Sequence, residues 1–558
     1  MNYSQQMASS NVEIVLPFIN LIQAKQKPGT VPTKIMKPKR NIDRAYSIDW
    51  FNIFLISVII FGILIRLIHL DKHVYWGDEI VTSIRIAGYR FSEVLQEISN
   101  KSILSAEDLL TYQNASSSRG LNTVIQGLVS DEPQHTPIYF VALHLWVKLF
   151  KNFSNSITQI RSFSVFLSLL SFPSLYWLCF ELFNSVTAGL IATAMVATSP
   201  FYYVYAQEAR PPVLWILCIL LSSALLLRAL RLNTKLSWVA YAASVVFSLY
   251  SFLFSVFVLI GHGFYILLIK GLKPNTVIIR YLIVVCVGVS AFMPWLLKIA
   301  SNLSTVSDST SWSSEKIGSF QLLRMVINNL RDVFFNIGES YAYLTFLLLI
   351  LIGFSFLFLI KRAPKSVWAF VLSLSSVTIV VLLIPDLING VRRSAASRYI
   401  IAPYLGINLS LAYLFSVQTK NLILQYKKCW RAIVTILLVM GISSCISISQ
   451  SEISFNQATY RNSAILAQVI NKYDNPLVIT GTQYFNNIIG AIGISHYLKP
   501  STRFKFVPDA SQLNDFTQAK NIFVYGKDIE FILKNLGVHH IQVIYKSDYE
   551  GLWQIQLP

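Results

Sequence analysis

The stretch FNIFLISVIIFGILIRLIHL, residues 51–70, decides the class of this protein. A mostly apolar run of about twenty residues is what a helix needs to cross a hydrocarbon layer ~30 Å thick. Similar runs recur along most of the 558 residues, of which 54% are hydrophobic. Only 13% are charged, against about 25% in an ordinary soluble domain. The sequence therefore predicts an α-helical polytopic membrane protein.

The charge of the chain fits this class better than it fits a nucleic-acid binder. The formal net charge is +19, but membrane proteins collect Lys and Arg in their cytoplasmic loops. No nucleic-acid-binding motif accompanies the charge, so we expect membrane lipids and no nucleic acid among the partners. Residues 1–49 form a basic tail that should stay in the cytoplasm. Residues 51–70 would then act as an uncleaved anchor, and residue 71 would emerge outside.

Ten further apolar runs are candidate spans: 162–181, 186–204, 212–229, 237–253, 254–269, 280–299, 339–360, 366–385, 399–417 and 432–450. The segment 137–151 is ambiguous, because it is apolar but short. Its His144, Lys148 and Lys151 fall on one helix face. An amphipathic helix lying flat in the interface fits this pattern better than a span.

The charges of the loops give an independent test of that interpretation. If 137–151 lies flat, four strongly basic connections fall inside, as the positive-inside rule requires: 228–236, 270–280, 361–365 and 420–431. We therefore predict eleven spans within a transmembrane domain at 50–450, with the N-terminus cytoplasmic and the C-terminus outside. Residues 71–160 become a large outer loop. Residues 301–338 become a second outer loop, either a lid or a plain linker with one surface helix.

The tail 451–558 has a different character from the rest of the chain. Its apolar runs have strand length at 476–480, 521–526, 541–545 and 552–557, and helical patterns lie at 484–497 and 528–536. This alternation predicts a small extracytoplasmic α/β domain.

Chemistry-bearing residues gather in the outer segments. Asp78 and Glu79 stand in YWGDEIVTS about eight residues after the first span. An acid beside an apolar wall can be tuned into a base, although it could also be a surface acid or a helix cap. Asp131, Glu132 and His135 stand in DEPQHTPIYF, which could equally be an ordinary acidic turn with a solvated histidine.

Two later outer turns carry arginines. The first, YAQEARPPVL (205–214), contains Gln207, Glu208 and Arg210. Arg210 could clamp a phosphate, snorkel to the interface, or pair with Glu208. The second turn lies in DLINGVRRSAASRYIIAPYLG (386–406) and is basic despite its outer position, which favours an anionic ligand or lipid headgroups. Its candidate residues are Arg393, Arg398 and Tyr399.

Taken in order, YWGDEIVTS, DEPQHTPIYF, YAQEARPPVL and SRYIIAPYLG resemble the GT-C glycosyltransferases, in particular the protein O-mannosyltransferase and aminoarabinose-transferase-like group (family 39/83 type). The resemblance runs to about residue 417 and leaves out the tail. It implies a membrane enzyme that moves a sugar from a polyprenyl-phosphate donor to a lipid, glycan or protein acceptor on the outer side. It also implies that Asp78 is the catalytic base or acceptor-orienting acid, with Glu79 in support.

Two motifs depart from the family pattern. The usual His-Pro-Pro-Leu-Tyr-Tyr reads HTPIYF at 135–140, and Gln-Glu-Ala-Arg-Pro-Tyr reads QEARPP at 207–212. The acids and Arg210 are present, so the departures bear on donor or acceptor preference. The chemistry needs a carboxylate for the nucleophile and cations for the leaving phosphate. Attack opposite that phosphate predicts inversion at the anomeric carbon.

Three further points stay open at this stage. No cofactor is indicated with certainty, but a divalent metal held by Asp78 and Glu132 is conceivable. A polytopic transporter or lipid flippase is compatible with eleven spans, although the ionisable groups gather at the outer lip and no internal repeat is visible. A non-catalytic membrane receptor is the third interpretation. The basic tail and the lack of a retention signal favour a bacterial plasma membrane.

Overall fold

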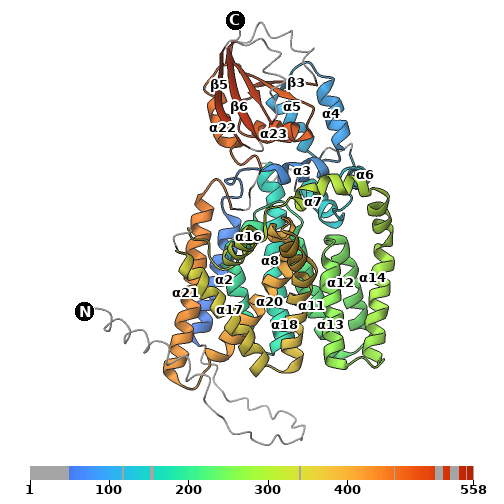
Figure 1. Ribbon diagram of the computed structural model, residues 1–558, viewed down its shortest axis with the longest axis vertical. Helices are drawn as coiled ribbons and strands as arrows, with labels where there is room; N and C mark the ends of the chain where they lie inside the picture. Colours follow the sequence, from blue (N-terminus) through green and yellow to red (C-terminus); the bar gives the residue numbers. More distant parts are fainter. Residues whose placement is uncertain are drawn as a thin grey trace, which may run out of the picture. The chain divides into compact units, whose positions relative to one another are not determined.

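The computed structural model describes residues 49–115, 119–150, 156–338, 341–455, 457, 459–508, 520–527, 540–547 and 550–556. The chain divides into two units, Met1–Ile48 and Asp49–Pro558, and all the described residues belong to the second unit. The predicted basic tail, apart from Asp49, and the helical pattern at 528–536 lie outside the described residues. Figure 1 shows the arrangement of the labelled elements.

The described residues contain eight helical segments that are long and apolar enough to cross a membrane: α2 (Trp50–Leu67), α8 (Ser156–Phe183), α11 (Pro212–Leu232), α14 (Thr276–Ser301), α17 (Ala342–Arg362), the segment Lys365–Asn389 formed by α18 (Lys365–Thr378), a π-helical turn and α19 (Ile384–Asn389), the segment Ser397–Gln418 that includes α20 (Ile401–Gln418), and α21 (Leu424–Gln450). This confirms the predicted polytopic membrane class.

The three other predicted spans correspond to shorter helices. The run 237–253 forms α12 (Lys235–Ser251), and 254–269 forms α13 (Ser255–Lys270). The run 186–204 is divided into α9 (Val186–Ala197) and α10 (Pro200–Ala206). The division has a local cause, because the Ser199 hydroxyl caps α10 by accepting from the Tyr202 amide and Pro200 starts the new helix. The count of eleven spans stays a prediction.

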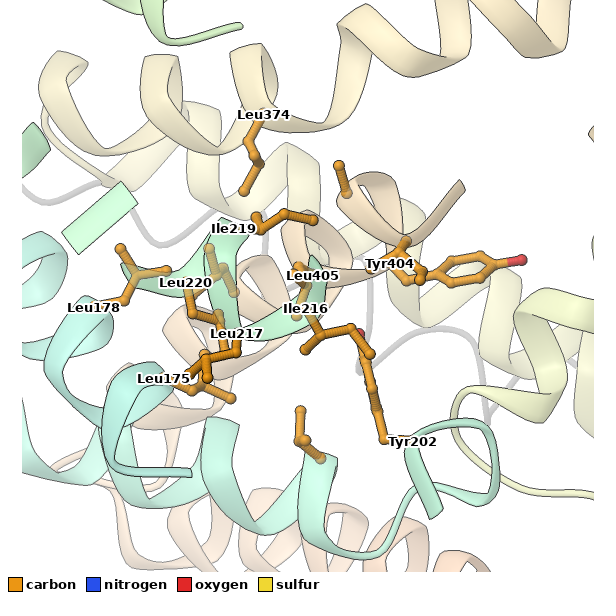
Figure 2. Close-up of a cluster of buried hydrophobic side chains, with 14 of the residues drawn as sticks. Leu175, Leu178, Tyr202, Ile216, Leu217, Ile219, Leu220, Leu374, Tyr404 and Leu405 are labelled. Carbon is orange, nitrogen blue, oxygen red and sulfur yellow. The ribbon is translucent and has the colours of Figure 1, made fainter. Parts of the chain in front are cut away.

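The helices differ in how much of their surface the protein itself covers. In the most apolar part of Ser397–Gln418, 83% of the residues are buried inside the protein, and for α11 the share is 78%. For α14 it is only 22%, so its apolar side chains face outward, as lipid contact requires. Figure 2 shows the centre of the buried core, where side chains from α8, α10, α11, α18 and α20 meet: Leu175, Leu178, Tyr202, Ile216, Leu217, Ile219, Leu220, Leu374, Tyr404 and Leu405.

The first outer loop folds into short helices: α3 (Gly77–Ile86), α4 (Phe91–Ser99), α5 (Ala106–Leu110), α6 (Leu121–Asp131) and α7 (Ile138–Leu149). Helix α7 corresponds to the segment that was predicted to lie flat, and with 12 residues it is short for a span; its orientation in a membrane stays a prediction. Its polar face differs from the expectation. Lys148 is exposed, but His144 is buried, with Nδ1 2.6 Å from the carbonyl oxygen of Ile86.

The C-terminal region forms a sheet with strands in the order β1-β3-β2-β4-β6-β5. Strands β2 (Leu477–Gly481), β4 (Ile522–Tyr525), β5 (His540–Lys546) and β6 (Gly551–Gln556) match the four predicted strands. The sequence did not predict β3 (Arg503–Val507), which pairs parallel to β2. Strand β1 (Leu104–Ser105) comes from the first outer loop and pairs antiparallel with β3, so the sheet draws on two distant parts of the chain.

Helix α3 is held between this sheet region and the membrane helices. Its Ile80 and Ile84 belong to the same buried cluster as residues of α22 (Ser463–Ile470), α23 (Phe485–Ser495) and the strands. Helix α23 packs closely against α3 at Gly493, where the side chain of any other residue would collide: an added Cβ would lie 2.6 Å from the Ile80 side chain. The C-terminal region therefore fixes the helix that carries the two adjacent acids.

Candidate active site

Helix α3 begins just before the acid pair, which places both carboxylates in its first turn. Negative charge is favoured there, because the first amide groups of a helix point toward it. Neighbouring residues on a helix project about 100° apart, so the two side chains leave α3 in different directions. Glu79 points into the protein and is fully buried, whereas the Asp78 side chain is 36% exposed.

Glu79 is the centre of a buried ion-pair network. Arg161, near the start of α8, donates from Nη2 to Oε2 at 2.6 Å and from Nε to Oε1 at 2.9 Å. The amide of Ala209 donates to Oε1 at 2.8 Å. Arg161 also donates to the carbonyl oxygens of Leu70, His73 and Val74. Glu79 therefore ties α3 to α8 and to the turn that carries Arg210, and it does not line a cavity.

Asp78 faces two arginines from two different turns. Its Oδ2 forms an ion pair with Nη1 of Arg210 and lies 3.9 Å from Nη1 of Arg398. Burial, together with the neighbouring Arg398 charge, lowers the pKa of Arg210 well below its usual value. Two largely buried guanidinium groups thus share the Asp78 carboxylate, and an anion that enters the site can compete with Asp78 for them.

The second acid pair also separates into two environments. Arg85 of α3 pairs with Asp131 at 2.8 Å, and the Phe91 amide donates to the same oxygen at 2.8 Å, so Asp131 is a structural link. Glu132 lies 3.6 Å from Arg85 and 3.4 Å from Nδ1 of His135. Burial would raise the pKa of Glu132, but His135 and Arg85 outweigh it and lower that pKa below its usual value.

A cavity of about 140 Å³ brings several of the predicted site residues together. It is lined by Asp78, Val81, Thr82, Glu132, Gln134, His135, Phe140, Arg210, Pro211, Ser309, Thr310, Trp312, Arg398 and Tyr399. A neighbouring cavity of about 270 Å³ shares Arg210, Arg398 and Tyr399 with it. The neighbouring cavity adds an apolar wall, made of Pro212, Phe252, Leu253 and Phe254, and also reaches Arg393. A charged compartment therefore adjoins a more apolar one.

The loop 301–338 covers the charged compartment. It consists of α15 (Leu303–Thr310), a short 3-10 turn and α16 (Ser319–Asp332). Trp312 from this loop lies over the Arg398 guanidinium, 5.3 Å from the ring centre. The loop is fastened to the turn 386–398, because the Arg392 amide donates to the Glu315 carbonyl at 3.0 Å and the Ile317 amide to the Gly390 carbonyl at 2.9 Å.

The remaining predicted residues lie beside these compartments. Gln207 is buried and donates to the carbonyl oxygen of Ile68 at 2.9 Å, which closes the end of α2. Glu208 is buried and lines neither cavity. Arg393 pairs with Asp386 at 2.7 Å and lines the apolar compartment only.

Three residues at the site were not predicted from the sequence: Arg161, Arg85 and Trp312. Arg161 had a usable signal, because a charged residue beside an apolar run needs a partner inside the protein. Arg85 had no clear signal, since its neighbours on the same face of α3 are Thr82, Val81 and Asp78. No signal in the sequence indicated that Trp312 would contact Arg398.

The suggested metal ligands do not fit a divalent cation. Asp78 and Glu132 line one cavity, but each carboxylate already faces cationic groups, Arg210 and Arg398 for the first and Arg85 for the second. Within the described parts of the chain, no group of three or more His, Cys, Asp or Glu residues could hold a metal ion. The guanidinium donors of Arg210 and Arg398 in the cavity lining suit an anion rather than a cation.

Comparisons with known proteins bear on the family and the fold of the chain. The family model described as dolichyl-phosphate-mannose-protein mannosyltransferase matches residues 134–297, which include most of the second motif and all of the third. No curated protein sequence matches the chain.

Two similar solved structures are of ArnT from Cupriavidus metallidurans. Its apo form has 11% sequence identity and a TM-score of 0.52, over 90% of this chain and 97% of that chain. Its form bound to undecaprenyl phosphate has 12% sequence identity and a TM-score of 0.51, over 91% of this chain and 98% of that chain. A third structure is of the archaeal oligosaccharyltransferase AglB from Archaeoglobus fulgidus in complex with an inhibitory peptide and a dolichol-phosphate. It has 10% sequence identity and a TM-score of 0.48, over 92% of this chain and 75% of that chain. The ArnT similarity confirms the predicted GT-C fold.

Proposed function

We propose that the protein is a membrane glycosyltransferase that moves a sugar from a polyprenyl-phosphate donor to an acceptor. The observation that carries the proposal is Asp78 standing between Arg210 and Arg398 in one cavity. The family model and the ArnT structure that contains undecaprenyl phosphate support it. A polyprenyl chain is far more soluble in hydrocarbon than in water, which suits a site built on apolar helices.

The ion pair between Asp78 and Arg210 gives a reason for the order of events. An incoming donor phosphate competes for Arg210 and Arg398, because both lie within reach of the same carboxylate. Once the phosphate takes over these cations, Asp78 is free to act as a base. Binding of the donor thereby prepares the carboxylate for its proton transfer.

The transfer step then needs no further group. The acceptor hydroxyl or amine forms a bond to the anomeric carbon, and its proton passes to Asp78. The bond from that carbon to the phosphate oxygen breaks, and the electron pair leaves with the phosphate, whose charge Arg210 and Arg398 stabilise. Attack from the side opposite the phosphate inverts the anomeric configuration.

The rest of the lining supplies positions for the sugar and the first prenyl units. The Gln134 Oε1 and Thr136 Oγ1 atoms are buried and have no hydrogen-bond partner among the described residues, so they can serve sugar hydroxyls. Glu132, His135 and Tyr399 border the same space. Phe252 and Phe254 suit the prenyl chain. Glu79 and Asp131 fix the position of α3 through their ion pairs with Arg161 and Arg85. The loop 301–338 acts as a lid.

The orientation follows from the loop charges. The N-terminus would be cytoplasmic, and the site and the C-terminal sheet would be extracytoplasmic, in a bacterial plasma membrane. The basic ends of the helices support this, since Arg280 contacts the α11–α12 connection at Asn233 and Arg431 pairs with Asp49 before α2.

The test is direct. Purified protein is incubated with a panel of polyprenyl-phosphate sugars and candidate acceptors, and released carrier phosphate is followed by mass spectrometry. We expect carrier release from at least one donor, with an inverted anomeric configuration in the product. Movement of labelled donor lipid across a vesicle without any sugar transfer would contradict the proposal and favour a flippase. A retained configuration would contradict the one-step mechanism.

A further inference from the structure

A second basic site lies at the end of the helices opposite the candidate active site. Helix α2 starts at Trp50 and leads toward Asp78 at its other end; its 18 residues span about 27 Å. Beside Trp50, one face of α21 borders a cavity of about 460 Å³. The cavity is lined by Trp50, Leu424, Lys427, Lys428, Arg431, Ala432, Thr435 and Ile436. We call it the α2–α21 cavity.

The lining of this cavity is divided along the helix axis. The α21 residues recur every three or four positions, which puts them on one face. Lys427 and Lys428 lie near the start of the helix, Arg431 lies one turn further, and the apolar side chains of Ala432 and Ile436 extend beyond. A basic mouth therefore leads into an apolar groove, and the volume is in the range of ordinary ligand sites.

The Arg431 guanidinium is fixed by its neighbours, but one of its hydrogen-bond donors has no acceptor among the described residues. Arg431 is buried, its Nη1 donates to Asp49 Oδ1 at 3.0 Å, and its guanidinium lies over the rings of Trp50 and Phe51 at 5.3 and 4.9 Å. Its buried Nε has no hydrogen-bond partner among the described residues. A buried donor without an acceptor is costly, and Arg431 lines the cavity, so a ligand phosphate that reaches Nε would be favoured.

The charge at this cavity is not balanced. Asp49 offsets Arg431, whereas the side chains of Lys427 and Lys428 make no hydrogen bond or ion pair within the described residues. Three cations, Lys427, Lys428 and Arg431, stand against one acid, Asp49, which acts on both Arg431 and Lys427. This positive balance beside an apolar groove matches a molecule with an anionic headgroup and a hydrocarbon chain. The chain's own N-terminal segment is a poor match, because residues 1–48 carry seven Lys or Arg against two acids, Glu13 and Asp43.

We propose that the α2–α21 cavity binds an anionic phospholipid of the leaflet remote from the active site. The phosphate accepts from Lys427, Lys428 and Nε of Arg431, and an acyl chain lies along Ala432 and Ile436 beside Trp50. Basic pockets between membrane helices are suited to such headgroups. The bound lipid would join α2 to α21, which pack against each other. This proposal does not depend on the glycosyl-transfer chemistry.

The experiment compares two lipids and two matched double variants of the full chain. Detergent-purified protein is titrated with phosphatidylglycerol and with phosphatidylcholine, and bound lipid is measured by native mass spectrometry. We expect at least tenfold tighter binding of phosphatidylglycerol. The variant K427Q/K428Q should weaken it about thirtyfold, because each lysine near a lipid phosphate is worth ~1 kcal/mol. The control K361Q/K365Q removes two exposed lysines away from the cavity and should change it less than twofold.

Three results would overturn the proposal. Equal binding of both lipids would exclude charge recognition, and equal behaviour of the two double variants would place the lipid elsewhere. Faster tryptic cleavage within residues 1–48 of K427Q/K428Q, without phosphatidylglycerol binding to the parent protein, would show that the cavity holds the chain's own N-terminal segment. The exposed Lys428 alone can be changed to Gln if the double variant is unstable, with an expected loss of about fivefold.

Discussion

Asp78 and Glu79 are consecutive residues of one helical turn, but their carboxylates lie in opposite surroundings. Glu79 is enclosed, is paired with Arg161 in a fixed geometry, and accepts from an amide of the turn that carries Arg210. Asp78 is partly exposed in a cavity and faces two arginines. Glu79 therefore stabilises the packing of α3 against α8, whereas the Asp78 carboxylate is accessible from the cavity. Six substitutions and a pH series test this difference between the two acids.

The largest effect is expected for Asp78→Asn. The amide cannot accept the acceptor's proton, so the transfer rate should fall by about three orders of magnitude. The loss of stability should be smaller than for Glu79→Gln, because the Asp78 side chain is 36% exposed and water can reach the site. Transfer rates and thermal unfolding curves of the variant and the parent protein measure the two effects. An active Asn variant would remove Asp78 from the mechanism.

Glu79→Gln should show the opposite pattern. It leaves the Arg161 guanidinium buried without its counter-charge, which should lower the free energy of unfolding by about 3–5 kcal/mol. Denaturant unfolding of the two single variants E79Q and R161Q and of the double variant measures the coupling. We expect the double variant to lose much less than the sum of the single losses. Additive losses would mean that the pair does not act as a unit.

Arg398→Gln should slow transfer about a hundredfold, because one of the two cations for the leaving phosphate is lost. The matched control is Arg393→Gln, since Arg393 is paired with Asp386 and does not line the charged compartment. We expect a change of less than about fivefold for the control. Similar losses in both variants would show that the turn acts through its overall charge.

The smallest effect concerns pH and the frame beside Glu79. Burial and the nearby Arg161 charge lower the pKa of His496 to about 4. The same two causes lower the pKa of His73 to about 4. The unfolded chain, with a histidine pKa near 6.5, takes up protons first as the pH falls. The contribution of these histidines to the free energy of unfolding is therefore complete above about pH 6.5. It declines toward pH 4, by at most about 1.4 kcal/mol per pH unit for each histidine.

The variant His496→Gln tests this pH dependence. It keeps a donor for Gln113, whose Oε1 lies 3.1 Å from Nε2 of His496. Thermal unfolding between pH 7 and 4.5 should show a shallower decline than in the parent protein, with the remaining slope due to His73. An unchanged slope would mean that His496 takes up its proton equally in both states.

The sequence predicted the fold where its signal is local. Apolar runs identified the long helices, and short β-branched runs identified four strands. Strand β3, RFKFV, was missed although its alternation of charged and apolar residues is a strand pattern. The join between β1 and β3 could not be predicted, since nothing in the sequence links residue 104 to residue 504.

The site followed a similar pattern. The four motifs supplied most of the residues that line the cavity, including Asp78, Arg210 and Arg398, whereas Ser309, Thr310 and Trp312 come from the loop 301–338. Their neighbours Glu79 and Asp131 share the same motifs but turned out to be buried links. One position along a helix decides between the two environments, and only the packing of α3 against α7 and α23 shows which side faces the cavity. The partners Arg161 and Arg85 depend on contacts across 82 and 46 residues.

The most direct test of the central claim is an experimental structure of the protein with bound polyprenyl phosphate. The account predicts the phosphate within hydrogen-bond distance of Arg210 and Arg398, with the Asp78 carboxylate released from its ion pair and facing the space for an acceptor. A phosphate bound away from both arginines, with Asp78 and Arg210 still paired, would contradict it.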